Sequence, residues 1–192
     1  YVGELGWEIY ISSEMSVHVF DEIMRRNQEL PIKLCGLHCL DSCRIEKAFR
    51  HFGHDISTED NALEAGLGFA VKTHKPKSKF GEFNGKYAIE KTKQEGLEKR
   101  LFQFVLDDPQ PLLYHNEPII RDGKIAGYLT SGNYGHFLGS SIGMGYVACN
   151  KKGESLEEQL DSKYMIDVAG KRILAKAFFK PAYDPDAIKV KL

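Results

Sequence analysis

The chain has 192 residues, and its 26 Lys and Arg against 27 Asp and Glu give a formal charge of −1. That balance excludes a strong field for nucleic acid or for a membrane surface, and no apolar run approaches the ~18 residues of a membrane-spanning helix. A hydrophobic fraction of 42% and a charged fraction of 28% indicate a soluble globular protein with one domain or two small ones.

The first residues, YVGELGWEIYI, contain neither an initiator Met nor a polar leader, so we expect a piece of a longer polypeptide. Trp7, Ile9 and Ile11 alternate with Glu8 and Tyr10, which predicts a strand. Two glycines precede it and suit a tight turn into the strand. We therefore expect only part of the parent protein's chemistry in this chain.

Helical patterns dominate the next stretch. Residues 12–27 and 36–50 carry apolar stripes at helical spacing, so both are predicted helices. Residues 63–71, LEAGLGFAV, are predicted as a strand in which glycines permit close approach of another backbone or a ligand. Residues 72–85 are rich in Lys, Gly and Ser and predict an exposed loop, and residues 87–94 predict a short helix.

From Arg100 onward the apolar period changes to two. Residues 101–106 and 143–149 are predicted strands, and the segments 118–127 and 164–175 are predicted hairpins that turn at Asp-Gly and Ala-Gly-Lys. Short strands at close spacing indicate a small barrel or a sandwich. The sequence thus predicts a mixed α and β region over residues 1–97 and an all-β domain over residues 98–192.

Three of the four cysteines lie four residues apart, at Cys35, Cys39 and Cys43. They are either a metal or redox cluster or small apolar residues that face a core, and the second interpretation is favoured because thiolates stacked along one helix face make poor tetrahedral geometry. His51 and His54 offer too few ligands, so no metal site is predicted. Unpaired cysteines fit a reducing compartment, either bacterial cytoplasm or the mitochondrial matrix.

Six segments, taken in order, resemble the folate-binding aminomethyltransferase family, whose best-known member is the T-protein of the glycine cleavage system. They are YVGELGWEIYI, GLHCLDSCRIEKAFRHFGHDI, LEAGLGFAVK, EFNGKYAIEKTKQEGLEKRLFQFVL, DGKIAGYLTSGNYGHFLGSSIGMGYV and AKAFFKPAYDP. The sequences of these segments are most similar to the C-terminal folate-binding region of sarcosine and dimethylglycine dehydrogenases. The resemblance implies an α+β fold, in which part of the folate-binding α+β region is followed by a C-terminal all-β barrel.

The resemblance also implies site residues. The family's Tyr and acidic residue at the pterin of tetrahydrofolate match Tyr1 and Glu8; a carboxylate can accept from both donors of the pterin edge, and an aromatic ring packs on the heterocycle. Glu4, between two glycines, is expected to serve turn geometry or a structural hydrogen bond. Leu40 occupies the place of a folate-contacting Arg, and Arg44, one turn later, reaches the same side or pairs with nearby carboxylates.

The implied parent is an enzyme that transfers a methylene group from an amine to tetrahydrofolate, either as a separate protein or fused to an FAD-dependent amine dehydrogenase. The family's catalytic Asp lies upstream of Tyr1, so this chain is expected to hold no catalytic residue, to bind no FAD, and to be inactive alone. Its expected partners are folate and the upstream part of the same polypeptide. The alternative is a non-catalytic regulatory subunit with the same fold, which Leu40 permits.

Overall fold

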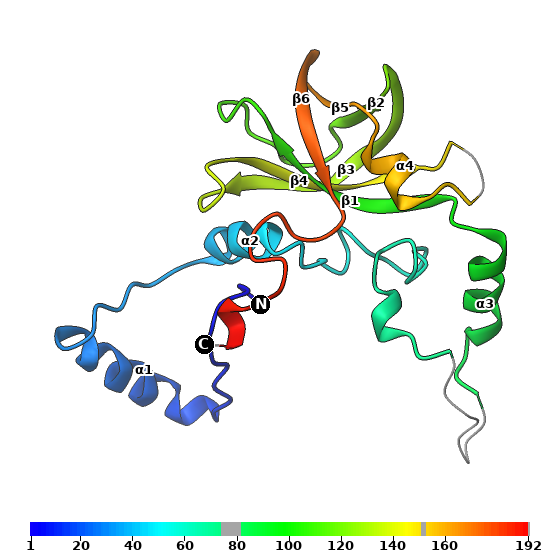
Figure 1. Ribbon diagram of the computed structural model, residues 1–192. Helices are drawn as coiled ribbons and strands as arrows, with labels where there is room; N and C mark the ends of the chain where they lie inside the picture. Colours follow the sequence, from blue (N-terminus) through cyan, green and yellow to red (C-terminus); the bar gives the residue numbers. More distant parts are fainter. Residues whose placement is uncertain (74–81, 151–152, 192) are drawn as a thin grey trace.

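The computed structural model describes residues 1–73, 82–150 and 153–191. Its largest feature is a closed antiparallel barrel in which the strands neighbour one another in the order β1-β4-β3-β2-β5-β6 (Figure 1). The strands are β1 (Lys99–Leu106), β2 (Pro118–Arg121), β3 (Lys124–Gly135), β4 (Ser140–Ala148), β5 (Tyr164–Val168) and β6 (Lys171–Phe178). The predicted α+β class with a C-terminal barrel is confirmed. Of the two alternatives, barrel and sandwich, the structure has the barrel.

Turn chemistry and a dense core explain the barrel. Asp122 and Gly123, and likewise Ala169 and Gly170, all have positive φ, the backbone that two-residue hairpin turns need. The core is made of aromatic and branched side chains that are almost fully buried, and its members are Phe102, Phe104, Leu106, Leu113, Ile119, Leu129, Val147, Tyr164, Ile166 and Ile173. Gly127 allows β3 and β4 to approach, since a Cβ there would lie 1.8 Å from the carbonyl oxygen of Tyr146.

Helices surround this barrel unevenly. The predicted helices correspond to α1 (Ser16–Arg25), flanked by short 3-10 turns, to a shorter α2 (Leu37–Glu46) and to α3 (Lys86–Glu95). The sequence reading missed α4 (Leu156–Leu160), although Ser155 and Glu158 form a capping box at its start. Further 3-10 turns lie at Gly68–Ala70 and Lys189–Lys191.

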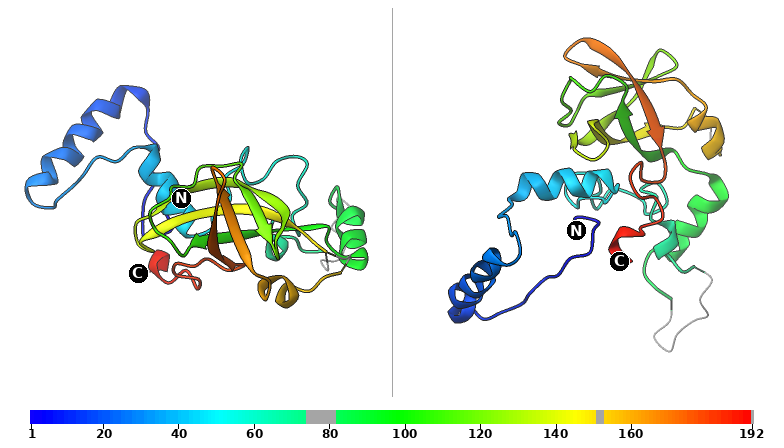
Figure 2. Two further views of the ribbon diagram at one scale, coloured as in Figure 1. Left: turned by 90° about the horizontal axis from the view of Figure 1, so that it is seen from above. Right: turned by 60° about the vertical axis from the view of Figure 1, so that its left-hand side comes forward.

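Helix α2 is the element that joins the two halves. Ile45 is fully buried on its barrel side, Ser42 Oγ donates to the carbonyl oxygen of Tyr134 at 2.6 Å, and Gln103 Nε2 donates to the carbonyl oxygen of Ile45 at 2.6 Å. By contrast α1 stands away from the barrel in every view and has no buried residue (Figures 1 and 2). Only α2 of these two helices therefore positions side chains against β3.

Two predicted strands are wrong. Residues 7–11 are extended but pair with no strand in the described residues, and residues 63–71 form turns and a 3-10 helix. A strand is stabilised by ladder hydrogen bonds to a neighbour, and Gly66, at φ +69, leaves the extended region altogether. The predicted loop over residues 72–85 lies mostly outside the described residues.

The cysteine prediction also needs correction. Cys35 and Cys39 are exposed and Cys43 is half-buried, so they do not form a core face. The first turn of α2 projects beyond the barrel, and only the later part of the helix is buried. The burial argument for a reducing compartment is weakened accordingly.

The two chain termini lie close together beneath α2 (Figures 1 and 2). Lys47 Nζ pairs with Asp184 Oδ2 at 2.5 Å, and the Lys47 side chain fills the space where a Cβ on Gly3 would stand. Tyr183 Oη donates to Glu4 Oε1 at 2.7 Å, which confirms the structural hydrogen bond predicted for Glu4. These contacts fix the opening motif against the C-terminal tail.

Candidate functional site

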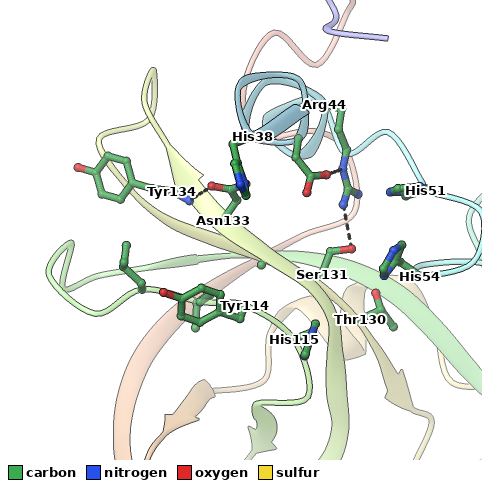
Figure 3. Close-up of a pocket in the computed structure, with 14 residues that line it drawn as sticks. His38, Arg44, His51, His54, Tyr114, His115, Thr130, Ser131, Asn133 and Tyr134 are labelled. Atoms are coloured by element: carbon green, nitrogen blue, oxygen red, sulfur yellow. Dashed lines mark hydrogen bonds and ion pairs between the residues drawn. The ribbon is translucent and has the colours of Figure 1, made fainter. Parts of the chain in front are cut away.

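A cleft of about 370 Å³ lies between α2 and the barrel (Figure 3). Helix α2 contributes three side chains spaced three residues apart, which places them on one face. The segment after α2, the segment before β2 and the middle of β3 complete the wall. The lining residues are His38, Asp41, Arg44, His51, His54, Leu112, Leu113, Tyr114, His115 and residues 130–134.

A buried ion pair forms the floor of this cleft. Arg44 Nη1 donates to Asp55 Oδ2 at 2.6 Å, and the side chains of Arg44 and Asp55 are 3% and 0% exposed. Arg44 Nε also donates to Asp41 Oδ1 at 2.7 Å, and Nη2 donates to Ser131 Oγ at 3.0 Å. The guanidinium thus ties α2 to the loop after it and to β3.

Both oxygens of the buried Asp55 carboxylate accept hydrogen bonds from protein donors. Besides Arg44, its Oδ2 accepts from the backbone N–H of His51 at 2.9 Å, and its Oδ1 accepts from Thr130 Oγ1 and Ser131 Oγ, both at 2.6 Å. A buried charge is tolerated when it is paired and its remaining lone pairs are satisfied. The network therefore holds the residues of the cleft at fixed positions.

Four imidazoles stand around this floor, two of them in contact. The His51 and His54 rings have centroids 4.6 Å apart, and the turn that carries them is closed by the Asp55 N–H donating to the His51 carbonyl oxygen at 2.9 Å. Figure 3 shows this pair beside Thr130, at the Arg44 end of the cleft. Within the described residues, no group of three or more His, Cys, Asp or Glu side chains is arranged to hold a metal ion.

Tyr1, a predicted folate contact, lies at the C-terminal end of α2. Its hydroxyl donates to the carbonyl oxygen of Arg50 at 2.5 Å, and its ring stacks on Phe49 with centroids 5.8 Å apart. Burial raises the pKa of Tyr1, although Arg44 and Arg50 act in the opposite direction. Tyr1 is therefore near the Arg44 network, yet it does not line the cleft.

Glu8 lies apart from the cleft. It is exposed, and its Oε2 accepts from the Tyr10 hydroxyl at 2.8 Å. Its carboxylate keeps lone pairs beyond that bond, and the Tyr1 ring is half exposed, and contact of either group with a pterin stays a prediction. The structure brings Tyr1 and Arg44 to the same part of α2 and leaves Glu8 on an exposed segment. Leu40, like Glu8, does not line the cleft.

The sequence did not predict that Asp55, Thr130 and Ser131 belong to the cleft. Asp55 follows His54 directly, and an acid near the end of a helix that carries Arg44 was the available signal for an ion pair. No local pattern links Ser131 to Arg44, because they are 87 residues apart and meet only through the barrel. The glycine-containing segment 139–145 forms a turn and part of β4.

Fold and site together define a protein with a helix-and-loop region docked on a closed six-stranded barrel, with a polar cleft at the junction. Two domain models agree with this order: the GCVT N-terminal domain matches residues 1–75, and the glycine cleavage T-protein C-terminal barrel domain matches residues 99–184. The chain belongs to the glycine cleavage T-protein family.

Three relatives show where the similarity lies. The formaldehyde-forming 4-methylaminobutanoate oxidase of Paenarthrobacter nicotinovorans is 38% identical over 185 residues, 96% of this chain and 21% of that protein. Human mitochondrial dimethylglycine dehydrogenase is 39% identical over 85% of this chain and 19% of its own length. The mouse mitochondrial pyruvate dehydrogenase phosphatase regulatory subunit is 38% identical over 94% of this chain and 21% of its own length. The chain spans about a fifth of these relatives.

A solved structure supports the fold. Glycine cleavage system aminomethyltransferase T from Bartonella henselae superimposes with a TM-score of 0.65 at 21% identity, covering 83% of this chain and 42% of that one. In the described part of this chain, no helix has the length and apolar character to cross a membrane. The predicted family and fold are thus confirmed, while the division at residues 97 and 98 stays a prediction beside a barrel that starts at Lys99.

Proposed function

We propose that this chain is the C-terminal portion of a tetrahydrofolate-dependent one-carbon enzyme, in which it forms one wall of the folate site. The parent transfers a methylene group from an amine to tetrahydrofolate, and FAD, where the parent carries a dehydrogenase domain, is bound outside this chain. Holding the folate against the reacting carbon is the contribution of this portion. The portion alone is inactive, and the parent works in bacterial cytoplasm or the mitochondrial matrix.

One observation carries the proposal: the opening motif is anchored through Tyr1 and Glu4, while the carboxylate of Glu8 is exposed to solvent. Tyr1 is held on Arg50 and Phe49, and Glu4 is held by Tyr183, whereas the Glu8 carboxylate is exposed. The Glu8 carboxylate accepts one hydrogen bond, from Tyr10, and its remaining lone pairs suit recognition of a ligand with two neighbouring donors. The names of two relatives, a methylaminobutanoate oxidase and a dimethylglycine dehydrogenase, point to amine-linked one-carbon chemistry.

Arg44 enters the proposal with a narrower role. Four of its five N–H groups donate to protein acceptors, so it contributes at most one hydrogen bond to folate. Its main effect is to fix α2, and through α2 the adjacent Tyr1, as a positioning residue. Leu40 adds no polar contact, so Glu8 supplies the charge for binding.

The upstream part of the same polypeptide is the proposed covering for α1 and the opening segment. Trp7 is 87% exposed and Tyr10 is 89% exposed, and the helix stripe of Val17, Phe20 and Ile23 is exposed as well. Large apolar side chains exposed in this number are typical of an interaction site. The relatives' greater length is consistent with such a covering.

Substitution Glu8→Gln in the full-length protein tests the folate assignment. Hydrogen bonds to a charged group contribute about 1.5–3 kcal/mol, so binding of 5-formyltetrahydrofolate, measured by titration calorimetry, should weaken by about tenfold to a hundredfold. Glu59→Gln, at an exposed acid outside the motif, is the matched control and should change nothing. Equal affinities for both variants would contradict the role of Glu8.

A second candidate is a regulatory subunit that keeps the fold without the folate chemistry. The relative named as a regulatory subunit is 38% identical, the same value as the oxidase, so identity does not separate the two functions. Leu40 in place of the family Arg is compatible with it. A parent that binds no 5-formyltetrahydrofolate, and whose purified form lacks the yellow colour of flavin, would favour this second function.

A further inference from the structure

The cleft beside α2 has a composition that the folate assignment does not use. Four of the chain's seven histidines line it, and all four are exposed. Neither Tyr1 nor Glu8 is among the lining residues. An imidazole donates hydrogen bonds and gains a positive charge when it is protonated, so such a cluster suits an anionic ligand. The distribution of donors and charges indicates what it binds.

Donors at the His51 end of the cleft exceed the protein acceptors available to them. The Arg44 side chain is 3% exposed, and its five N–H groups have four acceptors: Asp41, Asp55, the Phe49 carbonyl and Ser131. One Nη2 hydrogen is left without an acceptor in the described residues. Figure 3 places this guanidinium beside the His51 and His54 rings, each of which adds an N–H donor. A ligand that accepts hydrogen bonds completes this set.

The charges around the rings decide when such a ligand is favoured. Asp41 and Asp55 carry two negative charges against one on Arg44, so with neutral imidazoles the cleft is net negative by one. Tyr114 and His115 face the cleft from the segment before β2, His38 from α2, and Tyr134 from β3. Protonation of two imidazoles reverses the sign to net positive. An anion and protons then favour each other's binding.

We propose that this cleft binds an oxyanion, a carboxylate or phosphate group, between His51, His54 and Arg44, and takes up protons from solvent as it does so. The protons move to the imidazoles, and no covalent bond forms or breaks. The cleft volume of about 370 Å³ exceeds one anionic group, and Leu112 and Tyr114 offer apolar surface to the rest of the ligand. The site uses neither Tyr1 nor Glu8 and shares only Arg44 with the folate assignment, so loss of folate binding in Glu8→Gln leaves it untouched.

The test is titration calorimetry of the full-length protein with sodium acetate, which is an anion throughout the range from pH 6 to pH 8. Binding should be several-fold tighter at pH 6 than at pH 8, because protonated imidazoles add positive charge to the cleft. Titrations in buffers with different ionisation enthalpies should show net proton uptake at pH 7. Binding without pH dependence or proton uptake would overturn the proposal.

Two variants with matched controls locate the effect. His51→Gln and His54→Gln should each reduce proton uptake and flatten the pH dependence, whereas His18→Gln, on exposed α1, should behave as the wild type. Asp41→Asn keeps an oxygen for Arg44 and removes a negative charge, so acetate should bind several-fold tighter, while Asp107→Asn should not. Unchanged or weaker acetate binding by Asp41→Asn would show that the charge of the cleft does not govern anion binding and would overturn the proposal.

A parallel titration with inorganic phosphate separates the two sources of the oxyanion. Tighter phosphate binding, still dependent on His51 and His54, assigns the cleft to phosphorylated ligands, and tighter acetate binding assigns it to carboxylates. Phosphate binding that the His51 and His54 substitutions leave unchanged would place the anion elsewhere and contradict the proposed site.

Discussion

The barrel buries its apolar side chains, whereas the opening region, residues 1–36, leaves most of its apolar side chains exposed. In the barrel, Phe102 and Phe104 are 1% and 0% exposed, and strands close the sheet on themselves. In the opening region, Phe20 on α1 is 49% exposed and Trp7 is 87% exposed. Both regions have comparable apolar patterns in the sequence, so the pattern alone does not determine burial.

Closure explains the difference. A closed barrel satisfies every strand's ladder within itself and buries one face of each strand against the others. An amphipathic helix such as α1 buries its stripe only against another element, and within the described residues none lies there. The barrel therefore stabilises itself, while the opening region depends on α2 and the C-terminal tail for the few contacts it has.

The largest effect expected from this difference comes from matched Phe substitutions. Phe104→Ala leaves a cavity in the barrel core and should lower the free energy of unfolding by about 3–5 kcal/mol. Phe20→Ala removes an exposed ring and should lower it by less than about 0.5 kcal/mol. Urea unfolding of the 192-residue chain measures both. A large loss for Phe20→Ala would mean that α1 packs on the barrel in solution, against the arrangement in Figure 1.

A smaller effect is expected where the two regions meet. Arg44→Ala leaves the buried Asp55 carboxylate without its cation, which in general costs about 3–5 kcal/mol. The backbone N–H of His51 and the two hydroxyls still donate to Asp55, so we expect about 3 kcal/mol.

The matched control for this pair is Arg25→Ala on α1. Arg25 pairs with Glu22 at the surface, where such pairs contribute at most about 1 kcal/mol, so its loss should be barely measurable. Equal losses for the two Arg variants, again by urea unfolding, would show that the Asp55 network does not stabilise the junction.

The same difference explains which elements the sequence predicts. Hairpin turns at Asp122-Gly123 and Ala169-Gly170 are local signals, and every predicted barrel strand was found, although β3 runs on to Gly135, well past the predicted end at residue 127. Residues 7–11 have a local strand pattern as well, yet a strand forms only with a partner, and none lies beside them in the described chain. Local patterns predict an element's tendency, and distant residues decide whether it forms.

The site was less predictable than the fold. Arg44 was identified from the sequence, with pairing to a nearby carboxylate as one of its open alternatives, and the structure pairs it with Asp41, three residues away in the same helix. Its contact with Ser131 crosses from α2 to β3, and the convergence of four histidines joins three separate segments. Without an alignment no sequence pattern links these positions, because their proximity depends on how α2 docks on the closed barrel.

The smallest effect expected is a pH dependence in the contact that joins the tail to α2. The hydrogen bond from Lys47, followed by backbone donors, lowers the pKa of Asp184 from 3.8 to about 2. A carboxyl whose pKa is lower when folded adds stability that is present above pH 4 and lost as the pH falls toward 2. The urea midpoint of the wild-type chain should therefore fall over that window by more than the midpoint of Asp184→Asn.

Asn suits this position because Asp184 has a φ of +44, a conformation that Asn tolerates. The carbonyl oxygen of residue 184 still accepts from Lys47 at 3.0 Å, so the variant loses the charge and keeps one hydrogen bond. Asp186→Asn, at an exposed acid two residues later, should leave the pH dependence as in the wild type. If Asp184→Asn and Asp186→Asn follow the wild type equally between pH 4 and pH 2, the charge of Asp184 does not hold the tail to α2.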